Sequence, residues 1–231
     1  MYYNDMRHTV SSSTKMTPTQ SSLDRQAGKY QVDDQRKAIL DAAETLFLRA
    51  GLENTRMVDI ARQAKITRAT LYRYFANRDE IAVLIQIRMM EKIRSVLPDE
   101  ALQPTLASQR LRARLIIRNF PQLRDAFRYI GMFDKIYLDI DPGSPLARWT
   151  KEQLALGGFG GRASAGRPGP PALPQELGVI LSVITWFLEK LALRGELTWS
   201  DPAVPLEEHL AFFESMIMRS FDELENKPET K

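Results

Sequence analysis

Nine consecutive residues, Thr67 to Phe75, read TRATLYRYF and combine side chains that can contact an anion. They include two arginines, two threonines and two tyrosines, whereas only a leucine, an alanine and the final phenylalanine are apolar. Guanidinium groups and hydroxyls donate hydrogen bonds to phosphate oxygens, and an arginine can also pair with guanine O6 and N7. This stretch therefore indicates either a surface that binds a polyanion or an ordinary amphipathic helix with a solvated face.

Positive charge is concentrated around the same stretch. The formal net charge is +3, and residues 1–80 carry 13 basic and 10 acidic side chains, so the whole excess lies in the first third of the chain. Between Arg56 and Arg78, six basic residues stand against one acidic residue, Asp59. A local surplus of this kind favours a polyanion as partner, although a solvated helical face would also account for it on charge alone.

Few residues are available for other kinds of chemistry. The chain has no cysteine, and His8 and His209 are its only histidines. A His-based catalytic triad, a multi-histidine metal site and a thiolate metal site are therefore not expected. We predict no catalytic residue, no metal and no cofactor, and hence no enzyme, although a catalytic pair of carboxylates stays compatible with the sequence.

Three observations favour the cytoplasm. The absence of cysteine suits a reducing compartment. The N-terminus lacks the basic-then-apolar layout of a signal peptide. The longest apolar run, Leu177 to Leu188, falls short of the roughly 18 residues that indicate a membrane span. We therefore expect a cytoplasmic protein without a membrane partner.

Hydrophobic spacing predicts the helices that would position the polar stretch. A first helix is predicted to begin near Asp33, which can cap it, and to end at Gly51, since glycine takes the positive φ common just past a helix. Apolar residues recur between them at steps of three and four, which marks one buried face. A short second helix is predicted over residues 57–64, where the small Ala61 lets another helix cross closely.

Lys65 and Ile66 would form a tight turn into a third helix, which Thr67 can cap. In that helix Leu71 and Phe75 are four residues apart and are predicted to face inward, which leaves the polar side chains outside. Two short helices joined by a tight turn form a helix-turn-helix, whose second helix lies in the major groove of DNA.

The outward side chains suit different parts of a DNA duplex. Arg68 can pair with guanine, and Ala69 can touch a thymine methyl group. Threonine and tyrosine hydroxyls along the helix suit phosphate oxygens, and a basic residue at the start of the next helix can hold the flanking backbone. The residues predicted to contact DNA are Lys65, Thr67, Arg68, Ala69, Thr70, Tyr72, Arg73, Tyr74 and Arg78.

The remainder of the chain is predicted to be helical. Asn77, with Glu80 three residues later, is typical of a capping box and predicts a fourth helix that ends near Leu97. Later stripes predict further helices, among which residues 177–193 are apolar nearly all round and so would be buried on more than one side. No segment shows a clear period-two alternation of apolar residues, so we predict an all-α protein.

The predicted helices and the composition divide the chain into three parts. Residues 1–30 are rich in Ser, Thr and Gln and are predicted to form a disordered arm. Residues 31–80 would form the helix-turn-helix DNA-binding domain, and residues 81–226 a second helical domain. Within the second domain, the glycine- and proline-rich residues 157–174 predict a loop.

Four short motifs follow one another along the chain in an order that is known from one protein family. They are Ala50-Gly51, Asp59-Ile60-Ala61, the run from Ile66 to Phe75, and Asn77-Arg78-Asp79-Glu80. Together they resemble the N-terminal domain of the tetracycline-repressor (TetR) family of bacterial transcription regulators, over about residues 33–82.

Two positions depart from the pattern of that family. Arg56 stands where the family usually has a Ser or Thr helix cap, so Thr55 is expected to cap the second helix instead. Lys65 replaces the usual turn glycine. If the turn needs a positive φ, lysine costs about 1 kcal/mol relative to glycine there, but it also adds a charge close to the DNA.

The resemblance implies an all-α homodimer of about nine helices that binds a palindromic operator in double-stranded DNA. Family members usually pair their last two helices with those of a second copy, which here are the helices near 175–194 and 205–222. Their middle helices usually enclose a small-molecule pocket, and a ligand there changes the spacing of the two DNA-reading heads. Residues 81–226 would thus bind the effector and form the dimer. The side chains that could line such a pocket are Phe120, Tyr129, Met132, Phe133, Tyr137 and Trp149.

The leading hypothesis is a dimeric repressor that an unknown small-molecule effector releases from its operator. One alternative is a helix-turn-helix regulator that is controlled by a protein partner or has no small-molecule effector. Another is an enzyme that uses its helix-turn-helix only for targeting, against which the scarcity of histidine and the absence of cysteine argue.

Overall fold

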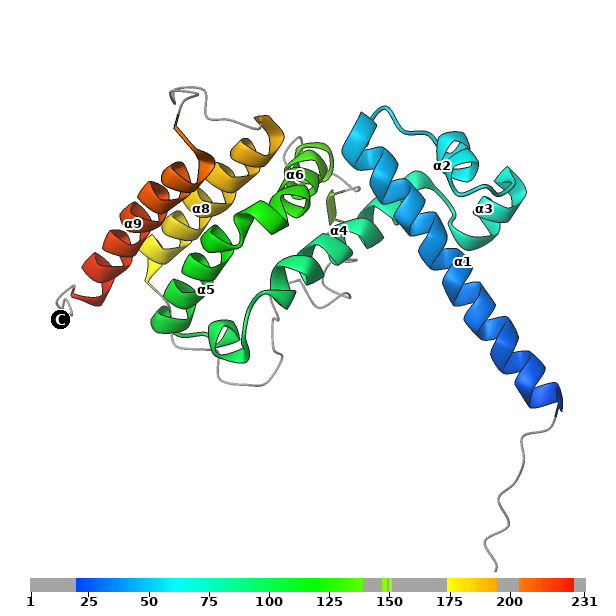
Figure 1. Cartoon of the computed structure of the whole chain (residues 1–231), viewed down its shortest axis with the longest axis horizontal. Coiled ribbons are helices and arrows are strands. Elements are labelled where there is room, and N and C mark those ends of the chain that lie inside the picture. The colour runs from blue at the N-terminus through cyan, green and yellow to red at the C-terminus, as the bar shows by residue number, and fades with distance from the viewer. Residues whose placement is uncertain (1–19, 139–146, 149, 151–173, 195–203, 227–231) are drawn as a thin grey trace, which may run out of the picture. The chain divides into compact units, whose positions relative to one another are not determined.

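The computed structural model of the chain describes residues 20–138, 147–148, 150, 174–194 and 204–226; the side chains of residues 20–33 and of Gln175 lie outside this description. The regular elements of the described residues are all helices, which confirms the all-α prediction (Figure 1). Two compact units divide the chain, residues 1–38 and residues 39–231. The helices are α1 (Gln20–Ala50), α2 (Met57–Gln63), α3 (Arg68–Tyr74), α4 (Arg78–Ser95), the 3-10 helix η1 (Asp99–Leu102), α5 (Leu106–Arg118), α6 (Phe120–Tyr137), α8 (Gln175–Arg194) and α9 (Leu206–Glu225).

Helix α1 begins earlier than the sequence predicted. It starts at Gln20 rather than near Asp33, so residues 20–30 of the predicted arm are helical. Residues 20–33 contain no proline, and their single glycine, Gly28, is tolerated inside a helix. The local sequence therefore allows the helix to begin before Asp33. Residues 1–19 lie outside the described part of the chain, and the domain boundaries stay predictions.

The first hydrophobic core joins α1, α2, α3, α4 and α6. In the second unit, α1 contributes Ile39 and Phe47, and α2 contributes Ile60, all with no exposed surface. Leu71 and Phe75 are likewise buried, which confirms the predicted inward face of the third helix. This core holds the two helices of the helix-turn-helix against a larger helical framework, so that α3 keeps one face outward.

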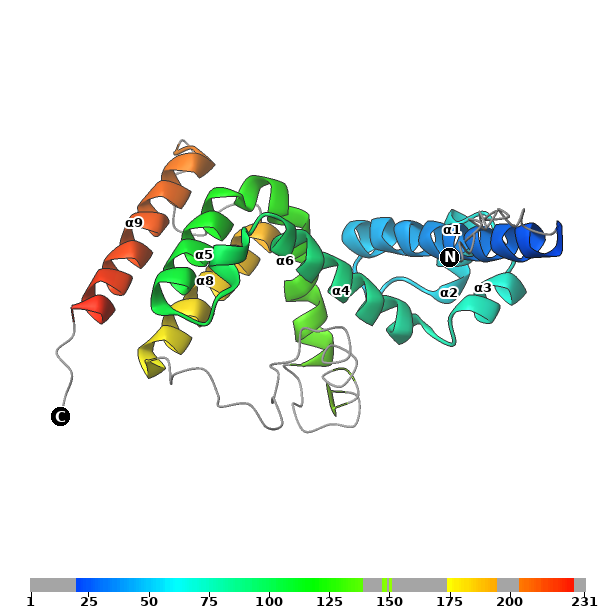
Figure 2. The same cartoon turned by 90° about the horizontal axis from the view of Figure 1, so that it is seen from below.

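The second core joins α5, α6, α8 and α9. Phe120, Leu188 and Phe221 are fully buried in it. Phe187 of α8 and Phe213 of α9 stack with their ring centroids 3.9 Å apart. Helices α8 and α9 accordingly lie side by side in both views (Figures 1 and 2). Among the described helices, none combines the length and the apolar character that crossing a membrane requires.

Candidate nucleic-acid interface

A tight turn joins α2 to α3. The Ile66 amide donates to the carbonyl oxygen of Ala61 at 3.0 Å, which closes the turn. Lys65 has φ +56°, the left-handed value that favours glycine, so the turn does need a positive φ at this position. The lysine side chain is exposed, which leaves its charge available to a partner.

Thr67 caps α3, as the sequence predicted. Its side-chain oxygen accepts a hydrogen bond from the Thr70 amide at 3.0 Å. The hydroxyl oxygens of the two threonines also lie 2.8 Å apart and share a hydrogen bond. Because one hydroxyl proton is used between them, this pair has less donor capacity for phosphate than the sequence suggested.

Helix α3 presents its polar side chains to solvent. Arg68, Ala69, Tyr72 and Arg73 are exposed, and 47% of the Tyr72 surface is accessible. For Ala69, Tyr72 and Arg73 this arrangement follows from the burial of Leu71, because residues one or two positions away on a helix lie on other sides of it. The structure thus brings Arg68, Ala69, Tyr72 and Arg73 to an outer surface, whereas the other two predicted contact residues of α3, Thr70 and Tyr74, are half-buried.

Tyr74 differs from Tyr72, although both were predicted to grip phosphate. It is half-buried and packs against the first core. The guanidinium carbon of Arg73 lies 5.4 Å from its ring centroid, a cation–π distance. Tyr74 therefore supports Arg73 and the core as well as offering a hydroxyl.

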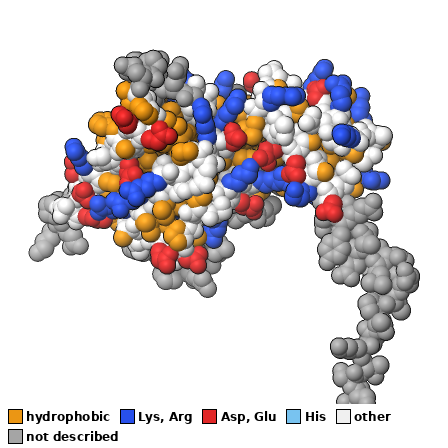
Figure 3. Space-filling model, in the orientation of Figure 1, with side chains coloured by type: hydrophobic (Ala, Val, Ile, Leu, Met, Phe, Trp, Pro, Cys, Tyr) orange, Lys and Arg blue, Asp and Glu red, His pale blue; other side chains and the backbone are white. Residues whose placement is uncertain are grey.

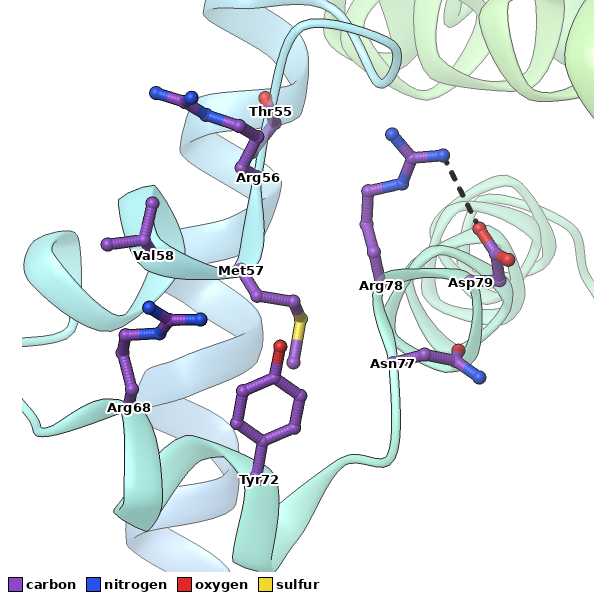
Figure 4. Close-up of a pocket in the computed structure, with 9 residues that line it drawn as sticks. All are labelled: Thr55, Arg56, Met57, Val58, Arg68, Tyr72, Asn77, Arg78 and Asp79. Atoms are coloured by element: carbon purple, nitrogen blue, oxygen red, sulfur yellow. Dashed lines mark ion pairs between the residues drawn. The ribbon is translucent and has the colours of Figure 1, made fainter.

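A hollow of about 470 Å³ lies between α2, α3 and the start of α4 (Figure 4). Arg68 and Tyr72 border it from α3, and Arg56 borders it from the residue before α2. Arg78 borders it from α4, so three arginines surround one depression. The complete lining is Thr55, Arg56, Met57, Val58, Arg68, Tyr72, Asn77, Arg78 and Asp79.

Arg56 was not among the predicted contact residues, yet its side chain is 79% exposed at the hollow. Its amide donates to an Asp59 carboxylate oxygen at 3.2 Å, and this backbone hydrogen bond is the main cause of a lowered pKa at Asp59. Arg56 is itself the N-cap residue of α2, so the expectation that Thr55 caps this helix is wrong. The Thr55 hydroxyl instead donates to the Gly51 carbonyl at 2.8 Å. The sequence signal that could have identified Arg56 was an arginine at a position where a helix-capping residue normally stands.

Asn77 caps α4, as the sequence predicted, but the Glu80 carboxylate bonds to the amide of the preceding residue, Ala76, and not to the Asn77 amide of a standard capping box. Asn77 accepts from the Glu80 amide at 2.9 Å, and a Glu80 carboxylate oxygen accepts from the Ala76 amide at 2.8 Å. The helix ends at Ser95, slightly before the expected Leu97. These two hydrogen bonds fix the start of the helix, whose first residue is Arg78.

Part of the Arg78 guanidinium is engaged in contacts within the fold. Its Nη1 donates to the Leu52 carbonyl at 3.2 Å, and its Nη2 lies 3.5 Å from Asp79. The side chain is 32% exposed, so part of the guanidinium still faces solvent. Asp79 also accepts a hydrogen bond from the Tyr137 hydroxyl at 2.7 Å. Arg78 thus links the start of α4 to the α1–α2 connection, a role that the sequence did not predict.

The predicted pocket residues fall into separate places. Phe120 belongs to the second core, whereas Tyr129, Phe133 and Tyr137 belong to the first core and Met132 packs against it. The Tyr129 hydroxyl donates to the Ala82 carbonyl at 2.8 Å. Trp149 lies outside the described residues. A shared effector pocket for these six residues stays a prediction. The hydroxyls of Tyr129 and Tyr137 form hydrogen bonds that join α6 to α4.

Comparison with known proteins agrees with this geometry. Residues 39–85 match the model of the family described as bacterial regulatory proteins, tetR family. The HTH-type transcriptional regulator HbdR of Aromatoleum sp. (strain CIB) is 31% identical over 67 residues, which are 29% of each chain. An uncharacterized HTH-type transcriptional regulator of Bacillus subtilis (strain 168), YhgD, is 32% identical over 73 residues, 32% of this chain and 38% of its own. The chain thus spans about a third of the length of these curated relatives.

Solved structures share the fold over most of the chain. A TetR family transcription regulator from Marinobacter aquaeolei VT8 is similar with a TM-score of 0.52 and 19% identity, covering 84% of this chain and 97% of its own. The flavonoid-responsive regulator FrrA has a TM-score of 0.50 and 21% identity, covering 86% of this chain and all of its own. At these identities the likeness shows the fold alone.

The fold and the matched segment define a helix-turn-helix domain of the class found in bacterial transcriptional regulators. Residues 39–85 carry the N-terminal domain of the tetR family of bacterial regulatory proteins. The resemblance noted from the sequence is therefore confirmed.

Proposed function

We propose that this protein is a homodimeric repressor that binds a palindromic operator through α3 and leaves it when a small molecule binds among the C-terminal helices. The observation that carries the DNA-binding part is the outer surface of α3 beside the hollow that Arg56, Arg68 and Arg78 surround. Basic side chains gather over α2 and α3, at the upper right of Figure 3. Guanidiniums at an open depression suit a phosphate backbone, and Arg68 can pair with a guanine edge.

Exposed apolar side chains support the homodimer. Val179, Val183 and Trp186 recur at helical spacing on α8, and Phe212 and Met216 do so on α9. Trp186 is 56% exposed and Phe212 is 74% exposed. Large exposed aromatics beside aliphatic residues are typical of an interface between proteins. A second copy of the chain would bury both stripes in one four-helix contact.

A chain of hydrogen bonds supports communication between the effector region and the DNA-binding helices. Tyr137 at the end of α6 donates to Asp79, whose neighbour Arg78 donates to the Leu52 carbonyl. A displacement of α6 would therefore pull on the start of α4 and on the connection that precedes α2. In a dimer, whose reading heads must lie about 34–36 Å apart, a small displacement of this kind weakens operator binding.

The proposal is tested by footprinting the purified protein on the promoter region beside its own gene, followed by binding measurements over a salt series. We expect a protected palindrome and an affinity that falls steeply with salt, since phosphate contacts release counterions. Protection of a single half-site by a monomer would contradict the dimer, and an affinity independent of salt would contradict the phosphate contacts.

A further inference from the structure

A small cavity of about 210 Å³ lies between α5, α6 and α8. Its walls are mainly apolar, with Ile116 from α5, Phe127 from α6 and Ile184 from α8 among them. The cavity is smaller than the roughly 300–1,000 Å³ typical of sites for drug-sized ligands, so it suits a molecule with a short apolar body. The two polar residues of its lining are Arg112 and Thr185.

The two polar residues differ in what they can offer to a ligand. The Thr185 hydroxyl donates to the Leu181 carbonyl at 3.0 Å, so its proton is already used. Arg112 donates from Nε to the Ala101 carbonyl at 3.0 Å, which leaves the two terminal nitrogens of its guanidinium. Arg112 is therefore the hydrogen-bond donor of this cavity.

Arg112 lacks the counter-charge that its neighbours have. Arg110, Arg114 and Arg118 of the same helix all form ion pairs with carboxylates of α9. In the part of the chain that the structure describes, no carboxylate lies within ion-pair distance of Arg112. Burial lowers the pKa of Arg112, and the nearby charge of Arg94 lowers it further. A half-buried guanidinium in this setting gains from an added anion.

We propose that the cavity binds a small carboxylic acid, with the carboxylate held by Arg112 and the apolar body held between Phe127, Ile116 and Ile184. This inference rests on the proposed function, because it names the chemical class of the effector and the side chain that selects it. The size of the cavity and the single cationic donor together disfavour neutral ligands and large polyanions such as nucleotides.

Binding is measured by isothermal titration calorimetry of the full-length protein with benzoate and hexanoate, and with benzamide and hexanamide as neutral counterparts. We expect at least one acid to bind and its amide to bind at least tenfold more weakly. The variant Arg112→Gln should lose about 10- to 100-fold in affinity for the acid, since it removes a charge-assisted hydrogen bond. Arg112→Lys keeps the charge and should retain part of the affinity.

The control variant is Arg124→Gln, which removes an exposed arginine of α6 that does not line the cavity. It should bind the acid like the wild type, and thermal melting shows whether Arg112→Gln and Arg112→Lys are folded. The proposal is overturned if neither acid binds, if acid and amide bind equally, or if Arg112→Gln retains full affinity.

A separate measurement distinguishes this inference from the proposed function. The acid that binds is added to the complex of the protein with its operator. Release of the operator supports both statements. If the acid binds in a manner that depends on Arg112 but the operator is not released, the ligand site is supported and the ligand-released repressor is refuted. If the protein binds DNA but binds neither acid, only the ligand site is refuted.

Discussion

Lys65 holds the turn between α2 and α3 in a conformation that favours glycine. Its φ of +56° is the only positive value found for a residue other than glycine in the described residues. A residue other than glycine in this conformation points to a function of its side chain, and the Lys65 side chain places an exposed positive charge beside α3. Stability and DNA affinity should therefore respond in opposite directions when this residue is changed.

The variant Lys65→Gly should gain up to about 1 kcal/mol in the free energy of unfolding, because glycine adopts the positive φ without strain. It should also bind DNA more weakly, with a salt slope reduced by about one phosphate contact. Urea unfolding and binding over a salt series measure the two effects. Ala64→Gly is the matched control, since Ala64 has φ −76° and gains nothing from glycine. A Lys65→Gly protein that unfolds more easily than the wild type would contradict the strain.

At the scale of the elements, α6 is tied to α4 by two tyrosine hydroxyls. Tyr129 donates to the Ala82 carbonyl, and Tyr137 donates to the Asp79 carboxylate. Burial raises the pKa of Tyr137, and the Asp79 carboxylate raises it further. Since the folded pKa lies above the unfolded one, this contribution to stability is complete below about pH 10 and is lost as the pH rises further.

The variant Tyr137→Phe should lose about 1–2 kcal/mol of stability, because a hydrogen bond to a charged acceptor is removed. It should also weaken operator binding, because Asp79 and Arg78 are then held less firmly at the start of α4. Tyr129→Phe is the control: it loses a hydrogen bond to a backbone carbonyl and should change stability with little effect on DNA affinity. Thermal melting and anisotropy titrations give both quantities. Equal DNA affinity for wild type and Tyr137→Phe would contradict the proposal that α6 transmits a displacement to the start of α4.

The elements also show what could be predicted from the sequence. Leu71 and Phe75, four residues apart beside a polar run, were enough to predict the orientation of α3, and Asn77 with Glu80 predicted the start of α4. These signals are local. The Arg78 link to Leu52 spans 26 positions and depends on the packed fold, so no local spacing reveals it. The division of the middle aromatics between two cores was missed for the same reason, whereas the early start of α1 was missed because residues 20–30 lack the apolar periodicity that indicates a helix.

At the scale of the whole molecule, the exposed aromatics of α8 and α9 predict the assembly. Phe212→Glu should weaken the homodimer at least tenfold, because it places a charge where an aromatic anchor would be buried. Sedimentation equilibrium of the wild type and the variant measures the change. Arg124→Glu, on an exposed position of α6, should leave the dimer intact. Identical association of wild type and Phe212→Glu would place the interface on another surface.

Base reading by α3 is the central claim, and one measurement tests it most directly. Anisotropy titrations at fixed salt compare the wild type and Arg68→Ala on the footprinted operator and on a set of single base-pair variants. The wild type should lose about 10- to 100-fold in affinity at contacted pairs. Arg68→Ala should lose discrimination at one position of each half-site, whereas Arg73→Ala should weaken binding alike on all sequences. An unchanged position-by-position profile in Arg68→Ala would contradict the account.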